Sequence, residues 1–192
     1  MATFKTIKEE IEDSIEAKQN LLKDPKLLKQ IEDLSLECLA TIQSGGKVIF
    51  AGNGGSFGDS QHLSAEFTSR FLFDRAPMAS VALGTNSSSM SAIGNDYGYE
   101  NVFSRELEAL GNPNDIFIAI TTSGNSKNII QAIEVAKKLK IKNYVLTGDH
   151  GGKLKDNNNC ICIPSTETAR IQECHILVGH MICGFVEKEF FK

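Results

Sequence analysis

Hydrophobic and polar residues follow a helical rhythm at the start of the chain. Isoleucines recur every four residues from Ile7 to Ile15, with charged residues between them, a spacing that places them on one face of a helix. Asp24-Pro25 is typical of a helix cap followed by a first-turn proline. A second apolar pattern then continues to Gly45. We therefore expect an N-terminal helical hairpin over residues 1–44 that packs on the rest of the domain or on a neighbouring subunit.

Beyond residue 45, short apolar runs alternate with helical patterns. The strand-like runs lie at 47–51, 78–83, 115–121, 142–147 and 160–163. The helical patterns lie near 57–73, 87–94, 100–110, 126–139 and 167–190. Alternating βα units are typical of a parallel sheet with helices on both faces. The pattern predicts an α/β fold, a three-layer sandwich with a five-stranded parallel sheet, in one domain over residues 45–192.

The last helical segment, 167–190, is apolar around most of its circumference. A helix of this kind is buried, and in so small a protein it favours an interface between subunits. We therefore expect a homo-oligomer.

Composition and charge narrow the classes of function. The chain has 192 residues, 41% of them hydrophobic and 23% charged, which fits a single α/β domain with a helical addition. A net charge of −4 without a basic run argues against a nucleic-acid partner. No apolar stretch approaches membrane-spanning length and no signal peptide is evident, so a cytoplasmic protein without a membrane partner is expected. The five cysteines form no C-x-x-C pair, which favours buried, reduced thiols.

Two loops of small residues carry the strongest chemical signal. Ala51-Gly52-Asn53-Gly54-Gly55-Ser56 and Thr121-Thr122-Ser123-Gly124-Asn125-Ser126 each follow a strand-like run and open a helix. Backbone N–H groups, hydroxyls and a positive helix end then meet at one point, which is an anion site with phosphate as the usual ligand. Two such loops on one parallel sheet predict a phosphorylated metabolite at the carboxyl ends of the strands.

Alternatives to phosphate binding are weaker. The first loop does not fit a dinucleotide fingerprint, because Phe57 stands where that motif needs its last glycine, and no P-loop motif is present. In the second loop, Ser126 could be a plain helix cap. Four hydroxyls and a glycine in six residues favour the functional interpretation.

A carboxylate and two histidines are candidate catalytic groups. His62 and Glu66 lie four residues apart in the helix that the first loop opens, so they share one face. Gln172 and His180 interrupt the last, apolar helix and need polar partners there. Taken singly, each histidine is more often a hydrogen-bonded core residue, and a Glu–His pair one turn apart is often solvated.

Five motifs in order resemble the sugar-isomerase (SIS) family, and within it the phosphoheptose isomerases. They are Gly-Asn-Gly-Gly-Ser at 52–56, Asn-Asp-Tyr-Gly at 95–98, the loop 121–126, Leu-Thr-Gly at 146–148 and Arg-Ile-Gln-Glu-x-His at 170–175. The resemblance implies an SIS-type fold, a homotetramer and a zinc ion in each subunit, held by His62, Glu66, Gln172 and His180. It also implies Glu66 and His180 as acid–base catalysts, and both suit the chemistry.

The substrate implied by the resemblance is a phosphorylated seven-carbon sugar. The expected reaction converts sedoheptulose 7-phosphate to D-glycero-D-manno-heptose 7-phosphate, the first step towards nucleotide-activated heptose for lipopolysaccharide or capsule. The alternative is a non-catalytic SIS protein that binds a sugar phosphate or a replication initiator, although Glu66 and His180 favour the enzyme. The expected substrate-binding residues are Asn53, Gly54, Gly55, Ser56, Glu66, Asn95, Asp96, Thr121, Thr122, Ser123, Ser126 and Gln172.

Overall fold

A five-stranded parallel sheet lies at the centre of the fold. The computed structural model describes residues 5–157 and 159–192, so residues 1–4 of the predicted N-terminal unit lie outside it. The strands are β1 (Val48–Gly52), β2 (Ser80–Ala82), β3 (Ile116–Ile120), β4 (Lys142–Gly148) and β5 (Asn159–Ile163). Their order is β2-β1-β3-β4-β5, with every pair parallel. The predicted five-stranded parallel sheet is confirmed.

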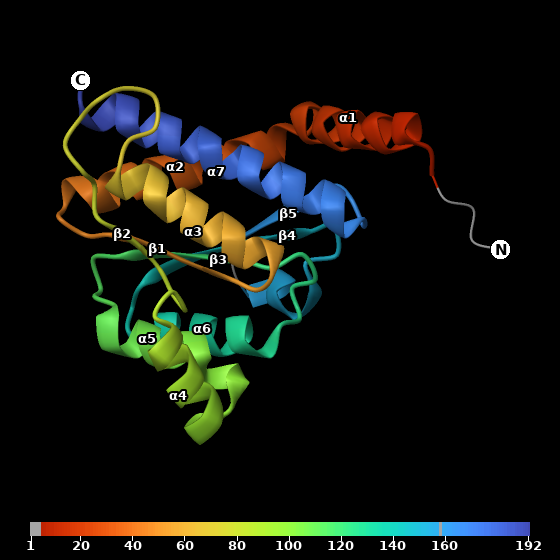
Figure 1. The fold of residues 1–192 in the computed structure, drawn as a ribbon. Helices are drawn as coiled ribbons and strands as arrows, with labels where there is room; N and C mark the ends of the chain where they lie inside the picture. Colours follow the sequence, from red (N-terminus) through yellow and green to blue (C-terminus); the bar gives the residue numbers. More distant parts are fainter. Residues whose placement is uncertain (1–4, 158) are drawn as a thin grey trace.

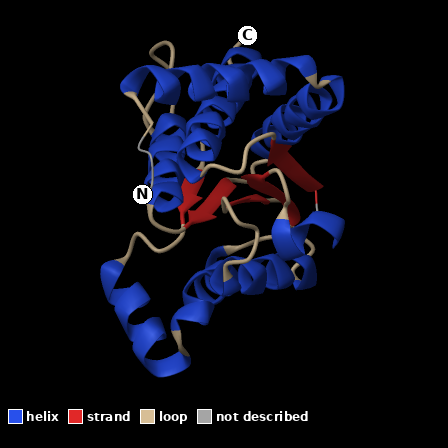
Figure 2. Ribbon diagram, turned by 90° about the vertical axis from the view of Figure 1, so that its right-hand side faces the viewer, coloured by secondary structure: helices blue, strands red, loops and turns tan. Residues whose placement is uncertain are grey.

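Helices cover both faces of the sheet and make the predicted three layers. They are α1 (Ile7–Lys23), α2 (Pro25–Gln43), α3 (Gly55–Thr68), α4 (Ser87–Tyr97), α5 (Val102–Leu110), α6 (Lys127–Lys138) and α7 (Thr168–Phe190), with 3₁₀ turns η1 (Tyr99–Asn101) and η2 (Gly152–Asn157). Helices α2, α3 and α7 lie on one face, whereas α5 and α6 lie on the other with α4 beyond them (Figures 1 and 2).

The strand β3 illustrates why the sheet is buried on both sides. Ile116, Ile118 and Ile120 belong to the core beneath α2, α3 and α7, whereas Phe117 and Ala119 belong to the core beneath α5 and α6. All five residues have 0% exposure. A continuous apolar run is therefore what a central parallel strand requires, because neither of its faces meets water.

Helix α7 owes much of its apolar character to packing within the chain. Val178, Ile182 and Val186 are buried in the core that α7 shares with α2 and α3, and Met181 remains 39% exposed. This burial accounts for most of the apolar circumference, so the expected oligomer remains a prediction. No helix in the described ranges is long and apolar enough to cross a membrane.

The N-terminal helices meet at Asp24, whose carboxylate accepts the N–H groups of Lys26 and Leu27 and caps α2. Helix α1 projects away from the sheet (Figure 1). It contacts the start of α7 through polar groups, with an Arg170 Nη1 to Glu10 carbonyl distance of 2.5 Å. The apolar stripe predicted from Ile7 onwards is largely exposed, at 83% for Ile7 itself. Packing of this stripe on a neighbouring subunit stays a prediction.

Helix α3 ends earlier than predicted. The pattern suggested a helix to residue 73, but α3 stops at Thr68. The side chain of Arg75 folds back and donates to the carbonyl oxygens of Glu66 and Phe67 at 2.6 and 2.7 Å. These carbonyls belong to the last turn of the helix and lack helical partners. The helix therefore ends where the Arg75 side chain, from further along the chain, supplies hydrogen bonds to the free carbonyl oxygens of its last turn.

Candidate functional site

The two predicted phosphate loops lie side by side at the point where the strand order reverses. From β1 the chain proceeds outward to β2, and from β3 it proceeds the other way to β4 and β5. The loops that follow β1 and β3 therefore diverge and leave a crevice at the carboxyl ends of the strands, where open α/β sheets bind ligands. The strand pairing Gly52 with Ile120 places both loop starts at this edge.

The first loop opens α3 without a side-chain cap. Gly54 stands at the N-cap with φ +57°, a conformation that favours glycine. Gly55 packs closely against the side chain of Gln172. A Cβ atom added at Gly55 would lie 2.5 Å from the Nε2 of Gln172, which is closer than Cβ contacts in proteins come. Asn53 is half-buried, and the Ser56 side chain is buried. The helix N-terminus is thus open to a ligand at Gly54 and Gly55.

The second loop opens α6, and Ser126 occupies the N-cap position without capping the helix through its side chain. Its Oγ lies 3.3 Å from the Oγ1 of Thr121, which is itself buried. The interpretation of Ser126 as a plain cap therefore does not hold. Ser123 is exposed, and its Oγ accepts the N–H of Asn125 at 3.2 Å. These hydroxyls are available for an anion at the helix end.

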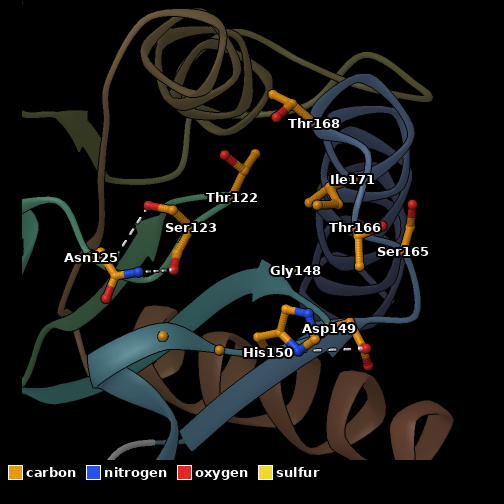
Figure 3. Close-up of a pocket in the computed structure, with 12 residues that line it drawn as sticks. Thr122, Ser123, Asn125, Gly148, Asp149, His150, Ser165, Thr166, Thr168 and Ile171 are labelled. Atoms are coloured by element: carbon orange, nitrogen blue, oxygen red, sulfur yellow. Dashed lines mark hydrogen bonds and ion pairs between the residues drawn. The ribbon is translucent and has the colours of Figure 1, made fainter.

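A cavity of about 280 Å³ opens beside this second loop (Figure 3). Three loops at the carboxyl edge of the sheet and the first turns of α7 form its wall. The lining residues are Thr122, Ser123, Asn125, Gly148, Asp149, His150, Gly151, Gly152, Ser165, Thr166, Thr168 and Ile171. The hydroxyls of Thr122, Ser123, Ser165, Thr166 and Thr168 in this lining could donate hydrogen bonds to a small anionic group such as phosphate.

Three of the four predicted metal ligands come together on α3 and α7. The Nε2 of His62 lies 2.8 Å from the Oε1 of Glu66 and 3.4 Å from the Nε2 of His180. One ligand atom from each residue lies within 4.8 Å of the other two. His62 is exposed, whereas Glu66 and His180 are partly buried. The Phe71 ring stacks on His180, with ring centroids 5.3 Å apart.

Gln172 lies apart from this cluster. Its amide contacts Gly55 in the first turn of α3, seven residues before His62 and about 10 Å from it along the helix axis. On α7 it follows Ile171 of the cavity and precedes His180 by about 12 Å. Gln172 therefore stands between the cavity and the cluster within one chain, and its role as a metal ligand remains a prediction.

Asp59 is a candidate site residue that the sequence pattern did not reveal. It lies on α3 one turn before His62, and its Oδ2 is buried with no hydrogen-bond partner in the part of the chain that the structure describes. Burial raises the pKa of Asp59, and the nearby His62 partly offsets this effect. A carboxyl group beside a His–Glu–His cluster is a typical feature of acid–base and metal sites. Its only sequence signal is its spacing from His62.

Asn95 and Asp96 do not reach the cavity in this chain. Both are exposed on the last turn of α4, a helix without buried residues. They line a separate hollow with Ser87, Ser88 and Ser91. The neighbouring Tyr99 does reach the first loop, since its hydroxyl donates to the Oδ1 of Asn53 at 3.3 Å. Sugar binding by Asn95 and Asp96 thus stays a prediction.

Comparison with known proteins agrees with the family that the motifs indicate. The profile of the SIS domain matches residues 4–148. Phosphoheptose isomerase 2 of Campylobacter jejuni is 50% identical over 186 residues, covering 96% of this chain and 92% of that protein. Phosphoheptose isomerase of Aneurinibacillus thermoaerophilus is also 50% identical, over 187 residues, covering 97% of this chain and 94% of that one.

Solved structures give the same result. A phosphoheptose isomerase from Francisella tularensis has a TM-score of 0.88 at 34% identity, covering 95% of this chain and 96% of that chain. A phosphoheptose isomerase from Neisseria gonorrhoeae has a TM-score of 0.85 at 39% identity, covering 94% of this chain and 99% of that chain. Together, the profile and the relatives establish that this chain belongs to the SIS domain family and, within it, to the phosphoheptose isomerases.

Proposed function

We propose that this chain is an aldose–ketose isomerase that converts sedoheptulose 7-phosphate to D-glycero-D-manno-heptose 7-phosphate. The observation that carries the proposal is the elongated arrangement of polar groups along α3 and α7. The N-termini of α3 and α6 have no side-chain cap and would bind an anion, and the His62–Glu66–His180 cluster lies about two turns further along α3. An extended sugar phosphate would fit this arrangement, with its phosphate at the helix N-termini and its reacting carbonyl at the cluster.

Glu66 is the proposed base and His180 the proposed acid. Glu66 removes the proton bonded to C1 of the open-chain ketose while His180 protonates the C2 oxygen, which gives an enediol. Glu66 then returns the proton to C2, and His180 accepts the proton of the C1 hydroxyl, which leaves the aldehyde. No redox partner is needed, because one proton moves between adjacent carbons. Such positioned groups contribute about 10²–10⁴-fold each.

The cluster fits a zinc ion by its donor set. Two imidazole nitrogens and a carboxylate oxygen that converge within 4.8 Å match the ligands of catalytic zinc sites, which keep a further position open. We place His62, Glu66 and His180 on the ion, with one ion in each subunit. Gln172 would have to leave its contact with Gly55 to serve as the fourth predicted ligand. A zinc ion bound there would polarise the sugar carbonyl as a Lewis acid.

The second loop would hold the phosphate, and the first loop the sugar. Phosphate oxygens would accept from the α6 N-terminus and from Ser123, Ser126 and the threonines of the loop. Asn53, Gly54 and Gly55 would contact the sugar near Gln172. We include in the proposal a homotetramer, a cytoplasmic location and a product that feeds nucleotide-activated heptose for lipopolysaccharide or capsule.

The test is direct turnover. Purified protein with zinc supplied is mixed with sedoheptulose 7-phosphate, and formation of the aldose is followed by NMR. We expect conversion to an equilibrium mixture and almost none with unphosphorylated sedoheptulose. Absence of conversion, together with measurable binding of the sugar phosphate, would instead support a non-catalytic SIS protein.

A further inference from the structure

An aromatic ring lies flat on the histidine that the mechanism uses as its acid. The segment after α3, residues 69–77 and here named the α3 exit loop, places Phe71 over His180 with an interplanar angle of 22°. Gly184 lies one turn beyond His180 on α7 and leaves room for this ring. A side chain at position 184 would crowd it, since an added Cβ would lie 3.3 Å from the Cε1 of Phe71. The Phe71 ring thus packs on a surface of α7 that His180 and Gly184 form.

Glu187 on α7 binds the α3 exit loop through three hydrogen bonds. Its carboxylate accepts the backbone N–H groups of Phe71 and Leu72 at 2.8 and 2.6 Å, and the Nε of Arg75 at 2.9 Å. The Glu187 side chain is 0% exposed and that of Arg75 is 2% exposed. Burial alone would raise the pKa of Glu187, but its three donors lower it below the ordinary value. A charged pair therefore persists in the core with its hydrogen bonds satisfied.

Arg75 connects this pair to the catalytic helix. Its Nη2 donates to the backbone carbonyl of Glu66 at 2.6 Å, and its Nη1 donates to the carbonyl of Phe67 at 2.7 Å. One guanidinium thus binds the end of α3 at Glu66 and the carboxylate of α7 at once. The two helices that carry the cluster are held in a fixed relation at this end.

We propose that Arg75 and Glu187 are positioning residues that hold Phe71 on His180, and so keep the imidazole directed at His62 and Glu66. The terminal torsion of a histidine is soft, so packing must choose the ring orientation. A reacting or ligating group must be held to within a fraction of an ångström by its supporting contacts. The catalytic part of this inference rests on the proposed function of His180.

The test compares two phenylalanines of the α3 exit loop. Phe71→Leu keeps an apolar side chain but removes the flat ring. Phe73→Leu is the matched control, since Phe73 is 38% exposed on the same loop. Phe71→Tyr keeps the ring and serves as the rescue variant. For each protein, zinc affinity is measured by competition with a chelator, and kcat and KM are measured with sedoheptulose 7-phosphate.

We expect Phe71→Leu to bind zinc about ten-fold more weakly, as loss of a supporting contact does. Its kcat should fall about ten- to hundred-fold with KM nearly unchanged, because the acid is misplaced rather than the substrate unbound. Phe71→Tyr and Phe73→Leu should match the parent. Glu187→Gln should reproduce the Phe71→Leu effects, and a folded Glu187→Gln with parental zinc affinity and kcat would overturn the role of the pair. If Glu187→Gln does not fold, Arg75→Lys takes its place, because lysine keeps the charge but cannot bind Glu187 and the Glu66 carbonyl with one planar group.

Parental zinc affinity and kcat in Phe71→Leu would overturn the inference, as would equal losses in Phe71→Leu and Phe73→Leu. The proposed function fails separately, if the parent does not turn over the sugar phosphate. In that case weaker zinc binding by Phe71→Leu alone still supports the positioning role.

Discussion

The side-chain amides of Asn53 and Asn128 donate to each other's carbonyl oxygens, at 2.9 and 2.8 Å. Asn53 follows β1, and Asn128 lies in the first turn of α6 and is 4% exposed. The pair therefore joins the two loops of the proposed anion site across the point where the strand order reverses. Neither loop can move away from the other without breaking both hydrogen bonds.

Replacing Asn128 with alanine should loosen this connection. Of its side-chain hydrogen bonds to described residues, Asn53 would keep the one with Tyr99. We expect a loss of about 1–3 kcal/mol in the free energy of unfolding. We also expect weaker binding of the sugar phosphate, because the loops would no longer be held at one spacing. Urea unfolding and calorimetric titration measure the two effects.

The control for Asn128 is Asn143→Ala. Among the described residues, the Asn143 side chain makes one long hydrogen bond of 3.4 Å, to the carbonyl of Ile141. Its loss should cost little stability and leave ligand binding as in the parent. Equal binding defects in both variants would show that the Asn53–Asn128 pair has no special role.

Alanine at Ser123 or Ser126 should weaken substrate binding and leave stability unchanged. Each loses a hydrogen bond to phosphate worth about 1.5–3 kcal/mol, or roughly ten- to hundred-fold in affinity. Asp24→Ala is the contrasting variant, because Asp24 does cap its helix and should cost about 1 kcal/mol of stability without affecting binding. A loss of stability in Ser126→Ala with unchanged affinity would contradict the phosphate site.

The positions of the two loops could be predicted from the sequence because their signals are local. An apolar strand, a run of small residues and a helix are all read from neighbouring positions. The early end of α3 could not be predicted in this way. It depends on Arg75, which folds back on Glu66, and on Glu187, which lies more than a hundred residues further along. Asn128 was missed for the same reason, since its partner is on another strand's loop.

Zinc should bind to the purified protein at about one ion per chain. Chelation should lower activity and added zinc should restore it. His62→Ala should lose most of the bound metal, because His62 contacts both other members of the cluster. Metal analysis of Gln172→Ala decides the fourth ligand, where unchanged zinc content would assign Gln172 to the sugar alone. Full activity in metal-free protein would contradict a catalytic metal.

His175 should make the protein less stable in mild acid. Burial lowers the pKa of His175 to about 4, with a partly opposing hydrogen bond to the Thr147 carbonyl. Between about pH 6.5 and 4 the unfolded chain therefore binds the proton and the native chain does not. Stability then rises with pH across this window and is lost as pH falls, by about 3 kcal/mol in total.

The His175→Gln variant cannot take up that proton. We expect it to be less stable at pH 7, because Gln fills the buried site imperfectly, yet to lose less stability between pH 6.5 and 4. Urea unfolding at several pH values gives the two slopes. Equal slopes in parent and variant would contradict the assignment to His175.

The candidate site could be predicted only in part from the sequence. The four-residue spacing of His62 and Glu66 predicts a shared helix face, and the structure confirms their contact at 2.8 Å. Their meeting with His180 depends on how α3 and α7 pack, which no local pattern contains. Asn95 and Asp96 lie on α4, away from the cavity, so motif order alone does not determine which residues share a pocket.

Glu66→Gln separates an isomerase from a protein that only binds its ligand. Glutamine keeps the shape of the side chain and can still accept a hydrogen bond from His62, but it cannot take a proton from carbon. We expect turnover to fall by about 10²–10⁴-fold. The sugar phosphate should still bind, because the phosphate loop is unchanged, and zinc occupancy should fall because Glu66 is a proposed ligand.

His180→Asn should reproduce this loss, and Glu108→Gln is the control because Glu108 is exposed on α5. Aldose formation followed by NMR gives turnover, and calorimetric titration gives binding. Since Glu66 would move the carbon-bound proton and His180 the oxygen-bound ones, the double variant should be little slower than the worse single variant, as for residues that act as one unit. Parental turnover in both single variants would show that Glu66 and His180 are not the acid–base pair.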